Sequence, residues 1–169
     1  IKNKNNIKIL NNDILKINFE KILKKDTVIF GNLPYNISTQ ILLKLIKISV
    51  WPPEYFKLIL MFQKEVAERI LAKYNTANYG RLSIVSNWRL KIIDHFDVSK
   101  NCFHPKPKVN SSVVIFEPKV NNSYIIKDII NLEKVTQIFF SNRRKMINKS
   151  FKKLFGNNQN INKIIKVDL

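Results

Sequence analysis

The sequence has few of the residues that build disulfides, metal sites and phosphate-binding loops. Its 169 residues include a single cysteine, Cys102, which excludes a disulfide framework and a cysteine-based zinc site. We expect Cys102 to be a packing residue. His104 has no second histidine or carboxylate nearby, and His95 lies in an apolar predicted strand where we expect a structural role, so we predict no metal site. Only three glycines occur, without a glycine-rich loop, and no apolar run approaches the ~20 residues that span a bilayer.

Acidic residues are also scarce. Lys and Arg number 30 against 12 Asp and Glu, which gives a formal net charge of +18. This excess favours a polyanionic partner, either nucleic acid or an anionic membrane surface. Codon bias in an AT-rich genome also enriches Lys, Asn and Ile, but the clustered arginines favour nucleic acid. Hydrophobic residues make up 45% of the chain, enough for a core in one domain or a domain and a half.

The most informative stretch begins with the apolar run 28–30 and ends in a short polar loop. Gly31 stops the run, and Asn32, Pro34 and Tyr35 follow within the next four residues. We interpret this as a buried strand that ends in a tight loop, where open α/β sheets bind their ligands. Asn32 supplies an acceptor oxygen, Pro34 lacks an N–H, and Tyr35 offers a flat face for stacking. This chemistry suits an amino-bearing base.

Hydrophobic periodicity predicts an alternation of strands and helices, which is typical of an α/β fold. The predicted strands are 7–10, 27–30, 56–62, 92–98 and 109–116. The predicted helices are a short one within 14–23 and longer ones over 39–48, 63–73 and 132–140. A further helix is predicted to follow from the stretch 79–83 and to reach about residue 88. Since 56–62 is almost entirely apolar, we expect that strand to be buried on both faces in a parallel sheet.

A second informative stretch, 102–114, links the last two predicted strands. Pro105 and Pro107 stiffen it into an extended loop, and Lys106 and Lys108 make it basic. Phe residues are usually in the core, but these neighbours place Phe103 in a loop. We therefore predict that Phe103 provides a second stacking face at the mouth of the site.

Both stretches resemble one enzyme family. Residues 32–38, Asn-Leu-Pro-Tyr-Asn-Ile-Ser, resemble the catalytic motif of the ribosomal RNA adenine N6,N6-dimethyltransferases. Residues 103–114 resemble a second signature of that family, with Asn110 in place of the usual Asp and Ser112 in place of the usual Ala; we expect neither change to prevent activity. The stretches 63–69 and 79–83 also match.

The resemblance implies the fold and the domains. It implies the later strands of a Rossmann-like class I methyltransferase sheet in residues 1–118. Residues 119–169 would begin a small helical RNA-binding domain. The family's glycine-rich donor loop and its first strands would precede residue 1. We therefore expect a fragment of a longer enzyme that binds the methyl donor poorly by itself.

The resemblance also implies the site and its chemistry, S-adenosylmethionine-dependent dimethylation of adenines in small-subunit ribosomal RNA during ribosome assembly. The implied catalytic residues are Asn32, Leu33, Pro34, Tyr35 and Phe103. The implied contacts to the cofactor are Asp13 and Asn32. Residue type alone favours a turn or helix N-cap role for Asp13.

Basic residues in two places are candidates for RNA contact. Lys106, Lys108 and the run Arg143, Arg144 and Lys145 would bind phosphates, which gives affinity without reading sequence. A solvated basic helix face is the alternative for 143–145. We expect the partners to be small-subunit ribosomal RNA and the assembling small subunit. We also expect a cytoplasmic monomer without a membrane partner.

Two other functions remain open from the sequence. One is a non-catalytic RNA-binding assembly or transcription factor on the same fold, which the intact motif Asn32–Tyr35 disfavours. The other is the related adenine methyltransferase that modifies large-subunit RNA. The signature at 103–114 and the basic run at 143–145 favour the small-subunit enzyme.

Overall fold

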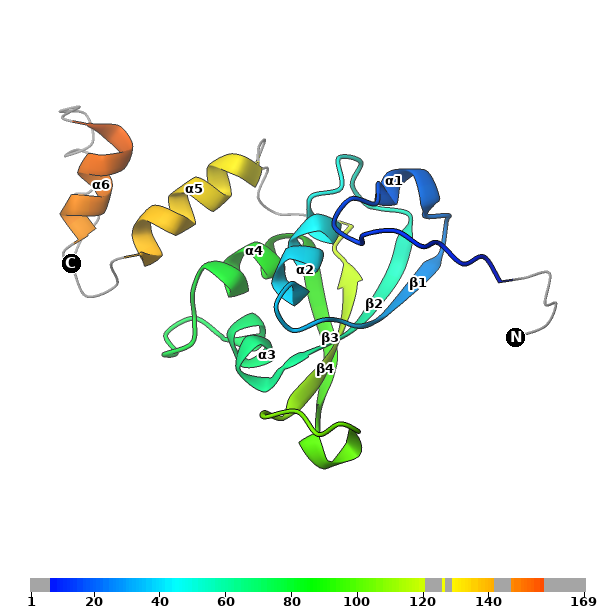
Figure 1. Ribbon diagram of the computed structural model, residues 1–169. Coiled ribbons are helices and arrows are strands. Elements are labelled where there is room, and N and C mark those ends of the chain that lie inside the picture. The colour runs from blue at the N-terminus through cyan, green and yellow to red at the C-terminus, as the bar shows by residue number, and fades with distance from the viewer. Residues whose placement is uncertain (1–6, 121–125, 127–128, 142–146, 157–169) are drawn as a thin grey trace.

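The structure is a computed structural model that describes residues 7–120, 126, 129–141 and 147–156. A four-stranded sheet forms the centre of the described part (Figure 1). The strands, in chain order, are β1 (Thr27–Asn32), β2 (Tyr55–Gln63), β3 (Leu90–Val98) and β4 (Ser111–Pro118). Their order across the sheet is β1-β2-β4-β3. The sheet is mixed, because β1 and β2 are parallel while β4 runs antiparallel to both of its neighbours.

Helices cover one side of this sheet. In chain order they are α1 (Phe19–Ile22), α2 (Ser38–Ile46), α3 (Lys64–Leu71), α4 (Arg81–Arg89), α5 (Ile129–Phe140) and α6 (Ile147–Phe155), with a 3₁₀ turn, η1, at Lys100–Cys102. In Figure 1, α2, α3 and α4 lie along the same side of the sheet, and α5 and α6 extend beyond α4. Parallel neighbours need a crossover connection, and α2 provides the one between β1 and β2.

The core lies between the sheet and these helices. Side chains alternate across a strand, so Leu58, Leu60 and Phe62 of β2 share one face with Val114 and Phe116 of β4. All five are fully buried, and each contributes about 1.5–3 kcal/mol to the free energy of folding. The helix α2 adds a buried stripe made of Ile41, Leu42, Leu45 and Ile46.

The opposite face of the sheet is less covered in the described part of the chain. Phe30 of β1 is 75% exposed and Phe96 of β3 is 53% exposed. Ile59 and Met61 of β2, on the same face, are half-buried. The sheet therefore has one dry face under α2–α4 and one face with exposed apolar side chains.

Most predicted elements are confirmed, but two predictions are wrong. Residues 7–10 form no strand, and Ile9 is 81% exposed; isoleucine favours strands only where a neighbouring strand is available for pairing. The strand β2 is not buried on both faces of a parallel sheet, because it pairs antiparallel with β4 and its burial alternates. A continuous apolar run does not reveal either property. In addition, α5 begins at Ile129 rather than Leu132.

Candidate active site

The sheet register brings the two informative stretches to one edge. Asn32, the last residue of β1, pairs with Met61, and Met61 pairs with Val113 of β4. Ser111, the first residue of β4, pairs with Gln63, the last residue of β2. The loop 33–37 after β1 and the loop 99–110 before β4 therefore lie at the same end of the sheet. This is the carboxyl end of the parallel strands, where such sheets bind ligands.

The loop 33–37 passes close to the core, and this requires glycine at position 31. A Cβ on Gly31 would lie 2.7 Å from Leu33 Cδ2 and 2.8 Å from Leu60 Cδ2, too close for either contact. Inside the loop, the Ile37 N–H donates to the Pro34 carbonyl at 3.1 Å. The loop is therefore a compact turn, and its Leu33 and Ile37 side chains pack against the core.

Polar contacts join this turn to α2. The Ser38 hydroxyl, which is buried, donates to the Tyr35 carbonyl at 3.2 Å. The Pro34 and Tyr35 carbonyls are thus both engaged. Among the described residues, the Asn32 side chain makes no hydrogen bond, and it is exposed. Asn32 consequently keeps its acceptor oxygen for a ligand.

A hydrogen bond joins the loop 33–37 to the start of β4, directly after the loop 99–110. The Tyr35 hydroxyl lies 2.6 Å from Ser111 Oγ, and Ser111 is fully buried. This contact fixes the tyrosine ring across a sequence separation of 76 residues. Because the hydroxyl is engaged, the aromatic face is the part of Tyr35 that is left for a ligand.

The loop 99–110 is held mainly at its two ends. The Asn110 side-chain oxygen accepts the Lys100 N–H at 3.0 Å, and the Asn110 carbonyl accepts the Lys64 N–H at 3.0 Å. Asn110 therefore keeps the acceptor that the Asp of the family signature would offer. Between these ends, Phe103 is half-buried, while Lys106 and Lys108 are exposed.

An ion pair supports the base of this loop. Lys64 Nζ lies 2.5 Å from Asp97 Oδ2, and the Ser112 hydroxyl donates to Asp97 Oδ1 at 2.6 Å. The hydrogen bonds from Lys64 and Ser112 lower the pKa of Asp97 below its ordinary value, and the bond to Asp97 raises the pKa of Lys64. The group joins the start of α3, the end of β3 and the start of β4.

Asp13 lies in an exposed turn before α1. Its Oδ1 accepts the Leu15 N–H at 2.9 Å, and the Lys44 ammonium of α2 donates to the Leu15 carbonyl. The turn is thus attached to the helix that follows the loop 33–37. The structure places Asp13 in this turn and records no contact between it and Asn32, so its cofactor role stays a prediction.

The remaining predictions concern the basic run 143–145, Cys102, metal ions and membrane helices. Arg143, Arg144 and Lys145 lie outside the described residues, so their RNA contact stays a prediction. The prediction for Cys102 is wrong: its side chain is exposed in η1, because the 3₁₀ turn projects from the sheet. In the described ranges, no three His, Cys, Asp or Glu side chains are grouped to hold a metal ion. None of the helices placed there is long and apolar enough to cross a membrane.

Sequence reasoning missed three residues that shape the site. Ser111, Asp97 and Lys64 fix the two loops, yet none was assigned a role. Ser111 lies inside the recognised signature, which could have marked it. The pairing of Asp97 with Lys64 depends on strand register and had no signal in the sequence.

Comparison with known proteins agrees with this arrangement. A sequence model of the family described as ribosomal RNA adenine dimethylase matches residues 1–168. The chain belongs to this family. Ribosomal RNA small subunit methyltransferase A of Pelagibacter ubique is 48% identical over 164 residues, covering 96% of this chain and 62% of that protein. The protein of the same name from Rhizobium etli (strain CIAT 652) is 44% identical over 151 residues, covering 89% of this chain and 54% of that protein.

Solved structures support the dimethylase fold. A dimethyladenosine transferase from Plasmodium falciparum superposes with a TM-score of 0.73 at 34% identity, covering 88% of this chain and 50% of that chain. The 23S rRNA methyltransferase ErmE, at 20% identity and a TM-score of 0.60, shows the fold alone. The predicted class I methyltransferase fold is confirmed. The chain spans roughly half to three fifths of the length of the relatives it matches.

Proposed function

We propose that the protein containing this chain transfers methyl groups from S-adenosylmethionine to the N6 amines of adenines in small-subunit ribosomal RNA, during ribosome assembly. The observation that carries the proposal is the Tyr35–Ser111 hydrogen bond at 2.6 Å. It joins the motif loop 33–37 to the first residue of β4, directly after the loop that bears Phe103. Family membership and the relatives' name, small subunit methyltransferase A, support the reaction and the substrate.

The acceptor amine needs help because its lone pair is delocalised into the adenine ring. Groups that accept hydrogen bonds from the two amine N–H groups favour a pyramidal nitrogen, whose lone pair points out of the ring plane. We assign this role to the Asn32 side-chain oxygen and the Leu33 carbonyl, because the Ile37 N–H already occupies the Pro34 carbonyl. Catalysis would then rest on positioning and electrostatics rather than on a general base.

Two aromatic rings would hold the extruded base. An adenine must leave its stack before its amine can react. Tyr35 presents a ring whose hydroxyl is already bonded to Ser111, and Phe103 presents a half-buried ring from the second loop. Stacking on such rings contributes about 1–3 kcal/mol per base.

The methyl donor fits the residues present. S-adenosylmethionine would supply an electrophilic methyl group on a sulfonium. Asp13 is exposed, and only its Oδ1 is engaged by the turn, so Oδ2 is available to accept from an adenine amino group. Asn32 is exposed and has an open acceptor oxygen. These two residues would hold the adenine end of the donor.

Basic side chains would bind the RNA backbone. Lys106 and Lys108 are exposed on the loop that carries Phe103, so phosphates flanking the target base would meet them first. The run Arg143–Lys145 would add phosphate contacts from the helical part, residues 119–169, beyond the catalytic part at 1–118. We infer that the protein acts as a monomer in the cytoplasm, where ribosomal subunits assemble.

Labelled-methyl transfer to small ribosomal subunits that lack the modification tests the proposal. The complete protein should incorporate label into adenine, and Asn32→Ala should lower the rate at least about a hundredfold, by loss of an amine acceptor. Lys25→Ala, at an exposed position just before β1 and so at the opposite end of that strand from Asn32, is the control and should retain the rate. If the wild type binds RNA but transfers no methyl group, the enzyme proposal is wrong and a non-catalytic assembly factor takes its place.

A further inference from the structure

The sequence segment 129–156, which includes α5 and α6, contains a single acidic residue, Glu133. The same segment carries seven basic residues, which are Lys134, Arg143, Arg144, Lys145, Lys149, Lys152 and Lys153. In such a segment a lone carboxylate is the one group that a polyanion would repel. Its position therefore indicates which side of the segment faces the rest of the protein.

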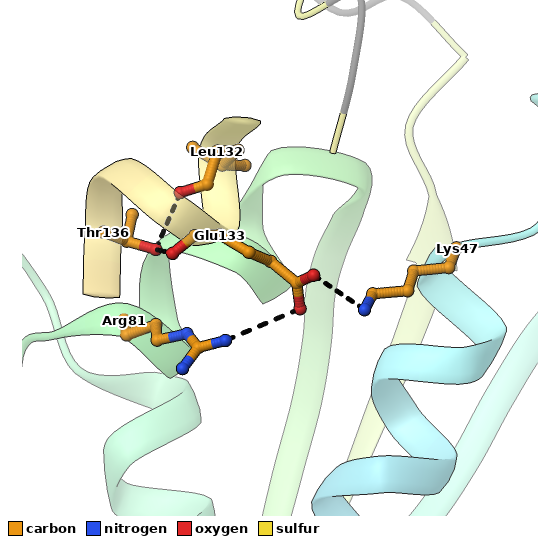
Figure 2. Close-up of polar contacts among 5 residues, drawn as sticks. All are labelled: Lys47, Arg81, Leu132, Glu133 and Thr136. Atoms are coloured by element: carbon orange, nitrogen blue, oxygen red, sulfur yellow. Dashed lines mark hydrogen bonds and ion pairs between the residues drawn. The ribbon is translucent and has the colours of Figure 1, made fainter. Parts of the chain in front are cut away.

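Glu133 faces inward, between two elements of the sheet-bearing part (Figure 2). Its Oε2 lies 2.7 Å from Lys47 Nζ, at the end of α2, and its Oε1 lies 3.7 Å from Arg81 Nη2, at the start of α4. The Glu133 side chain is only 15% exposed. One turn along α5, the buried Thr136 hydroxyl bonds back to the Leu132 carbonyl at 2.8 Å, so it is satisfied within its own helix.

We propose that Glu133 is a positioning residue that sets the orientation of α5 and α6 relative to the loop 33–37, through its ion pairs with Lys47 and Arg81. The inference rests on the proposed RNA methyltransferase function, because its consequence is the placement of basic residues around an RNA substrate. The attraction to two cations selects one face of α5 for docking. Repulsion from RNA phosphates keeps that face away from the substrate.

The docking position is connected to the site through rigid elements. Lys47 caps α2, and the first residue of α2, Ser38, holds the Tyr35 carbonyl. At the other end of α2, Arg89 of α4 donates to the Ile46 and Ile48 carbonyls at 2.7 Å and 2.8 Å. Both partners of Glu133 thus belong to elements fixed to the site.

The basic helix α6 follows the orientation of α5. The Phe139 and Phe151 rings meet edge to face with centroids 5.1 Å apart, and the Ser150 hydroxyl donates to the Ile138 carbonyl at 3.3 Å. A change in how α5 docks therefore moves the lysines of α6. For a polyanionic substrate, a misplaced basic helix weakens productive binding more than it slows the chemical step.

A distance measurement tests the positioning directly. Gln40→Cys, exposed on α2, takes one spin label, and Lys152→Cys on α6 takes the other, in the complete protein with Cys102 and any further cysteine replaced. We expect a narrow distance distribution with Glu133 present, a broader or shifted one in Glu133→Gln, and a narrow one in Glu133→Asp. The matched control Lys134→Gln, an exposed neighbour, should leave the distribution unchanged. An unchanged distribution in Glu133→Gln would overturn the inference.

Steady-state kinetics with the unmodified small subunit as substrate tests whether Glu133 positions the basic helices or only stabilises the fold, because KM and kcat are measured separately. Glu133→Gln should raise the KM for the subunit about fivefold, as expected for coupled charges in contact, with kcat unchanged. Glu133→Asp should restore the KM to within about twofold, by the same coupling. A fall in kcat with an unchanged KM would overturn the inference. Absence of methyl transfer in the wild type would refute the proposed function instead, and the spin-label result does not depend on it.

Discussion

The two loops that meet at the candidate active site are fixed in different ways. The loop 33–37 is short, and its Leu33 and Ile37 side chains pack against the core. Its Pro34 and Tyr35 carbonyls accept hydrogen bonds from the Ile37 N–H and the Ser38 hydroxyl. The loop 99–110 is longer and mostly exposed, and Asn110 together with the Asp97 ion pair holds it at its base.

This difference suits the two roles that we assign to the loops. Acceptors for an amine must be held within a fraction of an ångström, which a loop seated on the core provides. A stacking ring and two phosphate-binding lysines tolerate more movement, and a flexible loop lets a bulky RNA enter. Each variant below tests whether the first loop is rigid and the second adaptable.

Among the variants that compare the two loops, the largest effect is expected from removing the aromatic ring on the rigid loop. Tyr35→Ala should lower kcat/KM for methyl transfer between about fivefold and a hundredfold, the stacking energy of one base, while RNA affinity stays nearly unchanged. Phe103→Ala removes a ring of similar size from the adaptable loop, and its effect should be smaller. Methyl incorporation and RNA binding, measured on both variants, test whether Tyr35→Ala lowers kcat/KM more than Phe103→Ala does. A Phe103→Ala defect larger than that of Tyr35→Ala would contradict the comparison.

Gly31 tests how tightly the short loop is seated. Gly31→Ala places a Cβ within 2.8 Å of two leucine side chains, one of them buried Leu60, and should reduce the free energy of unfolding by about 1–3 kcal/mol. Chemical denaturation of the complete protein measures this. Gly156→Ala is the contrast, because its Cβ meets nothing within 4 Å and only its positive φ of 65° is strained. If denaturation shows no loss for Gly31→Ala, the loop is not seated on the core.

Asn110 tests the end of the long loop. Asn110→Ala removes the acceptor for the Lys100 N–H and should reduce stability by about 0.5–1.5 kcal/mol, with faster amide exchange across 99–110. Asn110→Asp keeps an acceptor and should behave as the wild type. Hydrogen exchange on both variants checks this. Equal exchange in Asn110→Ala and the wild type would mean that other contacts hold the loop.

The sequence predicted elements better than it predicted contacts. The apolar spacing of α2 and the proline-rich stretch at 102–114 located one helix and one loop correctly, because each signal is local. The wrong prediction for 7–10 has a physical origin, since a strand needs a partner that local sequence does not specify. The Tyr35–Ser111 bond and the Lys47–Glu133 pair also depend on packing between distant elements, and a single sequence contains no record of it.

The smallest effect is expected from the ion pair below the long loop. Hydrogen bonds from Lys64 and Ser112 lower the pKa of Asp97 from its ordinary value of 3.8, so the stabilisation is fully present above that pH and disappears as the pH falls through the lowered pKa. The bond to Asp97 raises the pKa of Lys64 above its ordinary value of 10.5, so Lys64 stays charged at neutral pH. Its part of the stabilisation is lost only as the pH rises through that raised pKa. Asp97→Asn should therefore lower the Tm slightly at neutral pH and converge with the wild type below 3.8. Asp94→Asn, on the same strand without an ion pair among the described residues, is the matched control. If both variants lose the same Tm at neutral pH, the loss comes from general charge and the pair does not brace the loop.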